Sequence, residues 1–213
     1  YDGIVQGILG GAGAVEATAS PPAIWGDEKE VWQKAVAAVG TPKQDLELAK
    51  KLVAEAGAPA KPIVIAVNAD DLLIVSAVTA IQQAASSIGL PIEIKKYAAQ
   101  EYGGLFYDPA ARRSIDLLVN AVTADIPDPL EIFSQIAPGA AFNFANIDDP
   151  AFADPLRAAL REPNATARAK LAAQAQQGLI DGAFIFPIYT INTRVFLGER
   201  ITGVPVTTLS QFY

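Results

Sequence analysis

Apolar and polar positions follow one another along this chain in patterns that predict both strands and helices. Two short runs, Pro62–Val67 and Pro91–Tyr97, are rich in β-branched residues, and the second alternates with period two, which predicts strands. Between them, the apolar stretch Leu72–Ile88 is typical of a helix, with Asn68–Asp71 before it as a cap and Gly89 after it. This order predicts a βαβ unit with parallel strands and a right-handed crossover.

Further apolar patterns predict the rest of an α/β fold. We expect helices at Glu28–Val39, Thr41–Ala56, Ala98–Phe106, Asp128–Ile136, Phe152–Arg161 and Ala165–Ile180, and strands at Ile115–Val119 and Ala183–Tyr189. Pro187 indicates that the last strand is bent or lies at a sheet edge. We expect loops over residues 11–27 and 138–150. Tyr1–Gly10 has the spacing of a helix end, which predicts that the chain was cut within an element.

The predicted helix at Thr41 has clear sequence signals. Thr41 would be its N-cap, Pro42 its first residue and Gly57 its end. Glu47 and Lys51 are spaced to form an ion pair along one side. One apolar face is predicted to consist of Leu46, Ala49, Leu52 and Val53.

Composition excludes several classes of function. The chain has no Cys and no His, so disulfides, Cys-bound zinc, thiolate nucleophiles and Ser-His-Asp triads are excluded from it. Its net charge of −7 argues against a nucleic-acid partner, because phosphate binding needs clustered Lys and Arg. No segment approaches the roughly 20 apolar residues that span a bilayer.

Two carboxylate pairs, Asp70–Asp71 and Asp148–Asp149, stand before predicted helices. Such pairs serve as helix caps or, less often, as calcium ligands or glycosidase carboxylates. A Gly-rich stretch at Gly11–Gly13 lacks the strand and third glycine of a dinucleotide-binding motif. We therefore expect helix caps, no metal site and no cofactor.

Several motifs occur in an order that resembles one known family. They are Gly7–Gly11, Pro21–Gly26, Asp45–Gly57, the Ala-Asp-Ile-Pro-Asp-Pro segment Ala124–Pro129, Asn143–Asn146 with the following Asp-Asp-Pro, and Phe186–Tyr189. In this order the chain resembles the C-terminal half of a family 5 extracellular solute-binding protein. This family comprises the oligopeptide-, dipeptide- and nickel-binding proteins of ATP-driven importers.

The resemblance implies a fold and a domain organisation. The fold class would be α/β, an incomplete periplasmic-binding-protein-like lobe of type II, with a mixed sheet flanked by helices. Residues 1–189 would form the second, C-terminal ligand-binding lobe without its first elements. Residues 190–213 would form a tail that returns to a first lobe outside this chain.

The sharpest site residue that the resemblance implies is Asp125, which in peptide-binding members pairs with the ligand's α-ammonium group. The alternative is that Asp125 braces the turn before Pro127. Peptide binders commonly carry Trp three residues earlier, where this chain has Val122. This departure makes a modified peptide, an opine, an oligosaccharide or another small solute as plausible a ligand as a general peptide.

Other candidate ligand-binding residues are polar or aromatic. Asn143 and Asn146 lie in a loop that faces the cleft in the family, although Asn also makes turns. Tyr102 could stack on a ligand at the cleft edge, but its four-residue spacing from the next aromatic also fits a core-facing helix. Tyr189 and Asn192 lie near the presumed hinge, where a role in the cleft or in the scaffold is possible.

The resemblance predicts a binding protein and not an enzyme. It would capture a small-molecule or peptide ligand between this lobe and the first lobe and deliver it to a membrane permease. It would be extracellular or periplasmic and lipid-anchored through a segment before this chain. The alternatives are a solute sensor domain of a regulator and a binder of an oligosaccharide, an opine or a metal chelate.

Overall fold

The computed structural model describes the chain except for residues 41, 58, 193–195 and 204–213. By their contacts, the residues divide into two compact units. The first unit comprises residues 1–11 and 43–121, and the second comprises residues 12–42 and 122–213. None of the helices among the described residues is long and apolar enough to cross a membrane.

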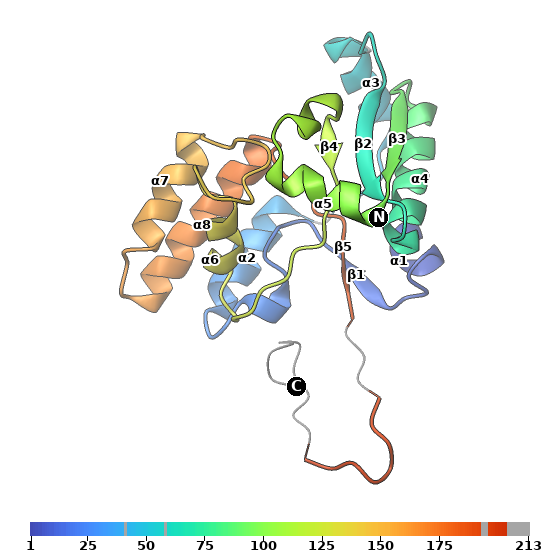
Figure 1. The fold of residues 1–213 in the computed structure, drawn as a ribbon. Coiled ribbons are helices and arrows are strands. Elements are labelled where there is room, and N and C mark those ends of the chain that lie inside the picture. Colours follow the sequence, from blue (N-terminus) through green and yellow to red (C-terminus); the bar gives the residue numbers. More distant parts are fainter. Residues whose placement is uncertain (41, 58, 193–195, 204–213) are drawn as a thin grey trace. The chain divides into compact units, whose positions relative to one another are not determined.

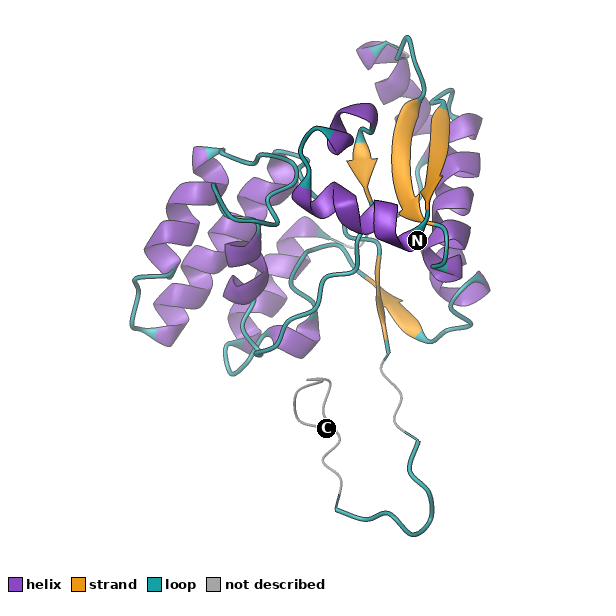
Figure 2. Ribbon diagram, viewed as in Figure 1, coloured by secondary structure: helices purple, strands orange, loops and turns teal. Residues whose placement is uncertain are grey.

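The first unit is built around a three-stranded parallel sheet in the order β3-β2-β4 (Figure 1). Its strands are β2 (Ile63–Asn68), β3 (Ile92–Tyr97) and β4 (Leu117–Leu118), and its helices are α1 (Asp2–Gly7), α3 (Leu46–Ala56), α4 (Leu72–Ser87) and α5 (Ala99–Tyr107). Parallel pairing of β2 with β3 across α4 confirms the predicted βαβ unit. Figure 2 shows these three strands in orange with helices beside them.

The central strand β2 is buried on both faces, as expected for a parallel strand between helices. Ile65 and Val67 pack with Val78 of α4 on one face. Ala66 points to the opposite face, where it packs with Tyr102 and Leu105 of α5. The two-residue period of the strand therefore divides the core of this unit into two layers.

The start predicted for α3 is wrong. The helix begins at Leu46, and the Asp45 side chain caps it by accepting a hydrogen bond from the Leu48 amide at 2.8 Å. Asp45 takes this role because its carboxylate reaches the free amides of the first turn. The predicted Thr41 cap lies outside the described residues.

The side-chain pairs of α3 also differ from the prediction. Glu47 pairs with Lys50 at 3.0 Å, and Lys51 pairs with Glu55, instead of Glu47 with Lys51. No residue of α3, all of which are described, is buried, and Leu52 is 54% exposed. The predicted apolar face is therefore present as a stripe of side chains on α3, but no described part of the chain buries it.

Among the described residues of the second unit, four α-helices share one core. They are α2 (Lys29–Val39), α6 (Leu130–Gln135), α7 (Pro150–Ala159) and α8 (Ala165–Asp181). The largest fully buried side chains among them are Trp32, Phe133, Phe152, Leu156 and Leu179. The helices α7 and α8 pack closely because Gly178 has no side chain: a Cβ there would lie 2.7 Å from the Phe152 amide nitrogen.

A two-stranded antiparallel sheet completes the second unit, formed by β1 (Gly13–Val15) and β5 (Tyr189–Ile191). The predicted strand Ala183–Tyr189 is wrong, because residues 183–188 form no strand and pairing starts only at Tyr189. Pro187 has no amide proton for a strand ladder, which explains the late start. The predicted loop over residues 11–27 contains β1, which the sequence prediction missed. The boundary proposed at residue 189 stays a prediction.

The loop between β1 and α2 is tied to the helices by buried polar contacts. The Ser20 hydroxyl donates to the Gln176 side chain of α8, and both residues are almost fully buried. The Trp25 indole N–H donates to the Ser20 carbonyl at 2.7 Å. Gly26 has φ +59°, and a Cβ there would lie 2.9 Å from the Pro127 carbonyl oxygen. This loop therefore runs directly against the segment that carries Asp125.

The predicted carboxylate caps are confirmed. Asp71 accepts a hydrogen bond from the Ile74 amide at the start of α4, at 2.9 Å. Asp149 accepts one from the Ala151 amide at the start of α7, at 2.8 Å. One member of each Asp pair is thus used to satisfy the free amides of a helix terminus.

Candidate functional site

Helix α6 anchors the turn that carries Asp125. One oxygen of the Glu131 carboxylate accepts hydrogen bonds from the backbone amides of Asp125 and Ile126, each at 2.8 Å. Glu131 lies in the first turn of α6, so the helix fixes the position of its carboxylate. The Asp125 side chain itself is exposed. The turn therefore presents this carboxylate to the surface on an anchored backbone.

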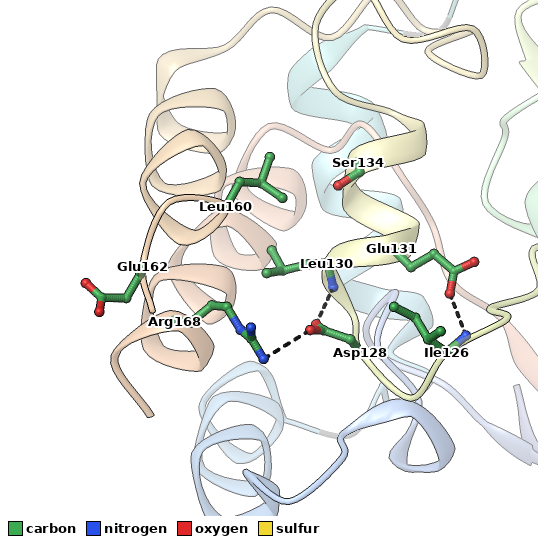
Figure 3. A pocket seen from close by; sticks show the side chains of 8 residues that line it. All are labelled: Ile126, Asp128, Leu130, Glu131, Ser134, Leu160, Glu162 and Arg168. Atoms are coloured by element: carbon green, nitrogen blue, oxygen red, sulfur yellow. Dashed lines mark hydrogen bonds and ion pairs between the residues drawn. The ribbon is translucent and has the colours of Figure 1, made fainter. Parts of the chain in front are cut away.

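A second anchor lies three residues further along the chain. Asp128 accepts a hydrogen bond from the Leu130 amide at 3.0 Å, and its other oxygen lies 3.4 Å from the Arg168 guanidinium of α8. Figure 3 shows the Arg168 side chain reaching toward Asp128 beside a shallow cavity of about 300 Å³. Leu160 and Ser134 line the same cavity. The segment is thus tied to both α6 and α8.

Among the candidates of the second unit, Val122 is 53% exposed and presents a small apolar surface. Asn143 is half-buried and uses its side chain locally: it donates to the Ile147 carbonyl at 2.8 Å and accepts from the Ile147 amide at 2.7 Å. Asn146 is exposed and has φ +51°, a conformation that Asn tolerates better than most residues. Both Asn residues therefore shape the turn, and Asn146 remains accessible.

The other two candidates of the second unit flank β5: Tyr189 is its first residue and Asn192 directly follows it. Tyr189 pairs with Val15 across the two-stranded sheet, and the Asn192 amide donates to the Ala12 carbonyl at 3.0 Å. Asn192 also lines a cavity of about 650 Å³. This cavity has Glu16 and Thr190 among its other polar residues.

Glu16 is a candidate that sequence reasoning missed. Its half-buried carboxylate accepts a hydrogen bond from the Thr190 hydroxyl at 3.1 Å. Burial raises the pKa of Glu16 above 4.5, and the hydrogen bond from Thr190 opposes part of that rise. The only sequence signal was a lone carboxylate at the end of a Gly- and Ala-rich stretch, and Thr190 is 174 residues away.

Tyr102 belongs to the first unit and serves its core. The side chain is 7% exposed, its hydroxyl donates to the Val119 carbonyl, and its ring meets Phe106 edge to face. Burial, and secondarily the charge of Asp71, raises the pKa of Tyr102 to about 12. The structure thus places Tyr102 in a different unit from the other six candidates.

The residues described include no group of three or more His, Cys, Asp or Glu side chains that could hold a metal ion. The acidic residues around Asp125 are instead engaged with backbone amides and Arg168. The chemistry available to this region is the binding of a ligand, because it offers an exposed carboxylate, neighbouring amides and two cavities.

Residues 1–144 match the model of the bacterial extracellular solute-binding proteins, family 5, middle region. The chain belongs to this family. The match includes Asp125, Val122 and Asn143 and ends before α7. No curated protein matches the chain.

Several solved structures have a similar fold. A dipeptide-binding protein from Pseudoalteromonas sp. SM9913 in complex with Met-Leu is 25% identical with a TM-score of 0.71, over 89% of this chain and 37% of its own. A periplasmic murein tripeptide-binding protein in its unliganded open form is 18% identical with a TM-score of 0.69, over 89% of this chain and 36% of its own.

A third relative, an oligopeptide-binding protein from Thermotoga maritima with bound mannohexaose, is 17% identical with a TM-score of 0.71. It matches over 88% of this chain and 38% of its own. The family 5 chain described here thus spans less than two fifths of the length of these relatives. The predicted periplasmic-binding-protein-like α/β fold is confirmed, and the family is one of extracellular binding proteins.

Proposed function

We propose that this chain supplies one wall of the ligand cleft in the solute-binding component of an ATP-driven importer. Family 5 membership supports a binding role, and the anchored turn at Asp125 carries the proposal. A carboxylate on a backbone held by Glu131 loses little freedom on binding, so its contact with a cation costs less ordering entropy. Asp125 would bind the ammonium group of the solute in a charge-assisted hydrogen bond.

The wall around Asp125 favours a small or partly apolar amine over a general peptide. Val122 leaves an open apolar surface where the resemblance has Trp in peptide binders. Asn146, an exposed residue of the loop that follows α6, can both donate to and accept from a polar ligand. We therefore place a short or modified peptide, or another amine-bearing solute, ahead of long peptides.

An oligosaccharide is the second candidate ligand. The relative from Thermotoga maritima is described with bound mannohexaose, which is uncharged. An accessible Asn and a carboxylate that accepts from hydroxyl groups suit a sugar as well as an amine. In that case Asp125 would act as a hydrogen-bond acceptor and its charge would matter less.

Transport would follow from closure of two lobes. A ligand that contacts this lobe and the first lobe stabilises the closed form over the open one. The closed protein, held at the outer face of the membrane by a lipid anchor upstream of this chain, would then dock on its permease. The ligand would bind weakly to this lobe alone, since half of its contacts would be missing.

The test uses the full-length protein purified without refolding. Native mass spectrometry, followed by denaturation, identifies the released solute, and titration then measures its affinity for wild type and for Asp125→Asn. For an amine we expect a loss of about 10- to 100-fold, since hydrogen bonds to charged groups contribute about 1.5–3 kcal/mol. Asp148→Asn, an exposed Asp of the loop before α7, is the control and should retain affinity.

The outcomes separate the candidates. If the released solute carries an amine and binds Asp125→Asn more weakly than wild type, the proposal is supported. If it is a sugar that binds Asp125→Asn as tightly as wild type, the second candidate is supported. An amine whose affinity is unchanged in Asp125→Asn contradicts the role of Asp125. Release of no solute from repeated preparations contradicts tight solute capture by the purified protein.

A further inference from the structure

The larger cavity of the second unit has the size and lining of a small-molecule site. Its volume of about 650 Å³ lies within the range of about 300–1,000 Å³ that small-molecule pockets occupy. One wall comes from Pro21, Pro22 and Trp25, and another from the β1–β5 sheet. The wall at Trp25 is rigid, because the indole N–H is bonded to the Ser20 carbonyl and most of the ring is buried.

The described residues that line this cavity contribute only negative charge to it. Glu16 is the only titratable side chain among the described residues that line it. Its one hydrogen bond within the described part of the chain comes from the Thr190 hydroxyl, and no described Lys or Arg forms an ion pair with it. A half-buried carboxylate of this kind keeps lone pairs for a further donor.

We propose that the cavity binds a small organic cation, with its ammonium or guanidinium group on the Glu16 carboxylate and its apolar part against Pro21, Pro22 and Trp25. The Thr190 hydroxyl holds the carboxylate in place. The Asn192 side chain also lines the cavity, and its amide oxygen offers a further acceptor to the same group.

Three observations select a cation over other ligands. An anion would meet the carboxylate without any described positive side chain to compensate it. A neutral alcohol would form a hydrogen bond to the carboxylate without the Coulomb attraction that an ammonium group adds. Burial removes water from Glu16, which also raises the pKa of this carboxyl. With less water around it, the carboxylate attracts a cation more strongly than an exposed carboxylate does.

This site does not depend on the role of Asp125. Asp125 is not among the residues that line the cavity, and Glu131 anchors the turn that carries it. The two sites share the loop of Trp25 and Gly26, which packs against the Pro127 carbonyl. Their failures can therefore be told apart by separate substitutions.

The experiment uses benzylammonium and the neutral benzyl alcohol as probes on the full-length protein. Ligand-observed NMR titration measures both dissociation constants. We expect benzylammonium to bind with a Kd of about 1 mM, as fits a ligand of this size, and at least about tenfold more tightly than benzyl alcohol. All variants carry Asp125→Asn, so that the turn offers no carboxylate to the probe. On this background Glu16→Gln, which preserves shape and the acceptor for Thr190, should remove that tenfold preference, while Asp148→Asn, an exposed Asp that does not line the cavity, should retain it.

Each contrary result overturns the proposal. Absence of benzylammonium binding, equal affinity for the two probes, or a preference unchanged in Glu16→Gln would each do so. Loss of the preference in Asp125→Asn would assign the cation to the Asp125 turn instead. If Glu16→Gln does not fold, the comparison of the two probes on Asp125→Asn with Glu16 intact still decides.

Discussion

The Glu131 carboxylate holds the backbone of Asp125, with its Oε2 atom 2.8 Å from the Asp125 amide nitrogen. The same oxygen accepts the next amide along the chain, also at 2.8 Å. Glu131, a residue of α6, thus fixes the backbone that carries the Asp125 side chain, which we propose to bind the ligand. Glu131 is a positioning residue in this arrangement, since its carboxylate is used by the turn.

The first prediction concerns Glu131→Ala. The substitution leaves two turn amides without their acceptor, so the free energy of unfolding should fall by about 1.5–3 kcal/mol, the range for hydrogen bonds to a charged group. Ligand affinity of the full-length protein should fall as well, because the turn must then be ordered on binding. Urea unfolding and calorimetric titration measure the two effects.

Conservative variants sharpen this test. Glu131→Gln keeps an acceptor oxygen without the charge and should show a smaller loss of both stability and affinity. Glu93→Ala, on an exposed position of β3, is the control and should alter neither by more than about 0.5 kcal/mol. Full affinity in Glu131→Ala would show that the anchor does not position Asp125.

The second prediction compares two glycines in helices. In Gly178→Ala the new Cβ would collide with the Ala151 carbonyl oxygen and lie 2.7 Å from the Phe152 amide nitrogen. These are backbone atoms of α7 and cannot rotate away, so we expect a loss of about 2 kcal/mol or more. Gly103→Ala in α5 meets nothing within 4 Å and should instead stabilise by about 0.5–1 kcal/mol.

Thermal and urea unfolding of both variants provide the check. Opposite signs for the two substitutions are the expected result, because helix propensity acts alike at both sites and only packing differs. A Gly178→Ala variant as stable as wild type would mean that α7 and α8 can separate without cost, which their buried interface argues against.

The third prediction concerns the pH dependence of stability through Glu16. Burial raises the pKa of this carboxyl above 4.5 in the folded protein, which favours the protonated form there. At pH values below the pKa of Glu16 in the unfolded chain, the protonated side chain contributes its full stabilisation to the folded protein. This stabilisation is lost as the pH rises through the higher pKa that Glu16 has in the folded protein. Glu16→Gln does not titrate, so its stability relative to wild type should increase as pH rises.

Unfolding free energies of both proteins between about pH 4 and pH 7 measure this difference. Thr190→Val removes the hydrogen bond that lowers the pKa of Glu16, so the same dependence on pH should become steeper in that variant. A difference that shrinks with rising pH would show that Glu16 is stabilised as a carboxylate, for example by a cation from elsewhere in the protein.

Most elements of the fold were predictable because their signals are local. The apolar run of β2, the Asp71 cap and the long helix that follows lie within one short stretch of chain. The start of α3 was mispredicted because Thr41–Pro42 and Asp45 both carry cap signals, and the choice depends on how the first turn is held.

The candidate site was predictable in part. The Ala-Asp-Ile-Pro-Asp-Pro segment marks Asp125 as a residue of interest, but nothing local assigns its anchor. The roles of Glu131 and Arg168 depend on where α6 and α8 lie. Whether Asp125, Val122, Asn143, Asn146, Tyr102, Tyr189 and Asn192 bind a ligand stays a prediction, to be tested on the full-length protein.

The sequence by itself determined the βαβ unit, most of the helices, the caps at Asp71 and Asp149, and the resemblance that the family 5 match bears out. Each of these depends on residues that are near neighbours in the chain or on the order of short motifs. Only the tertiary structure decided the pairing of β1 with β5 and the cavity beside Glu16. Those features join residues about 170 positions apart, and no local preference encodes which distant partner a three-residue strand will find.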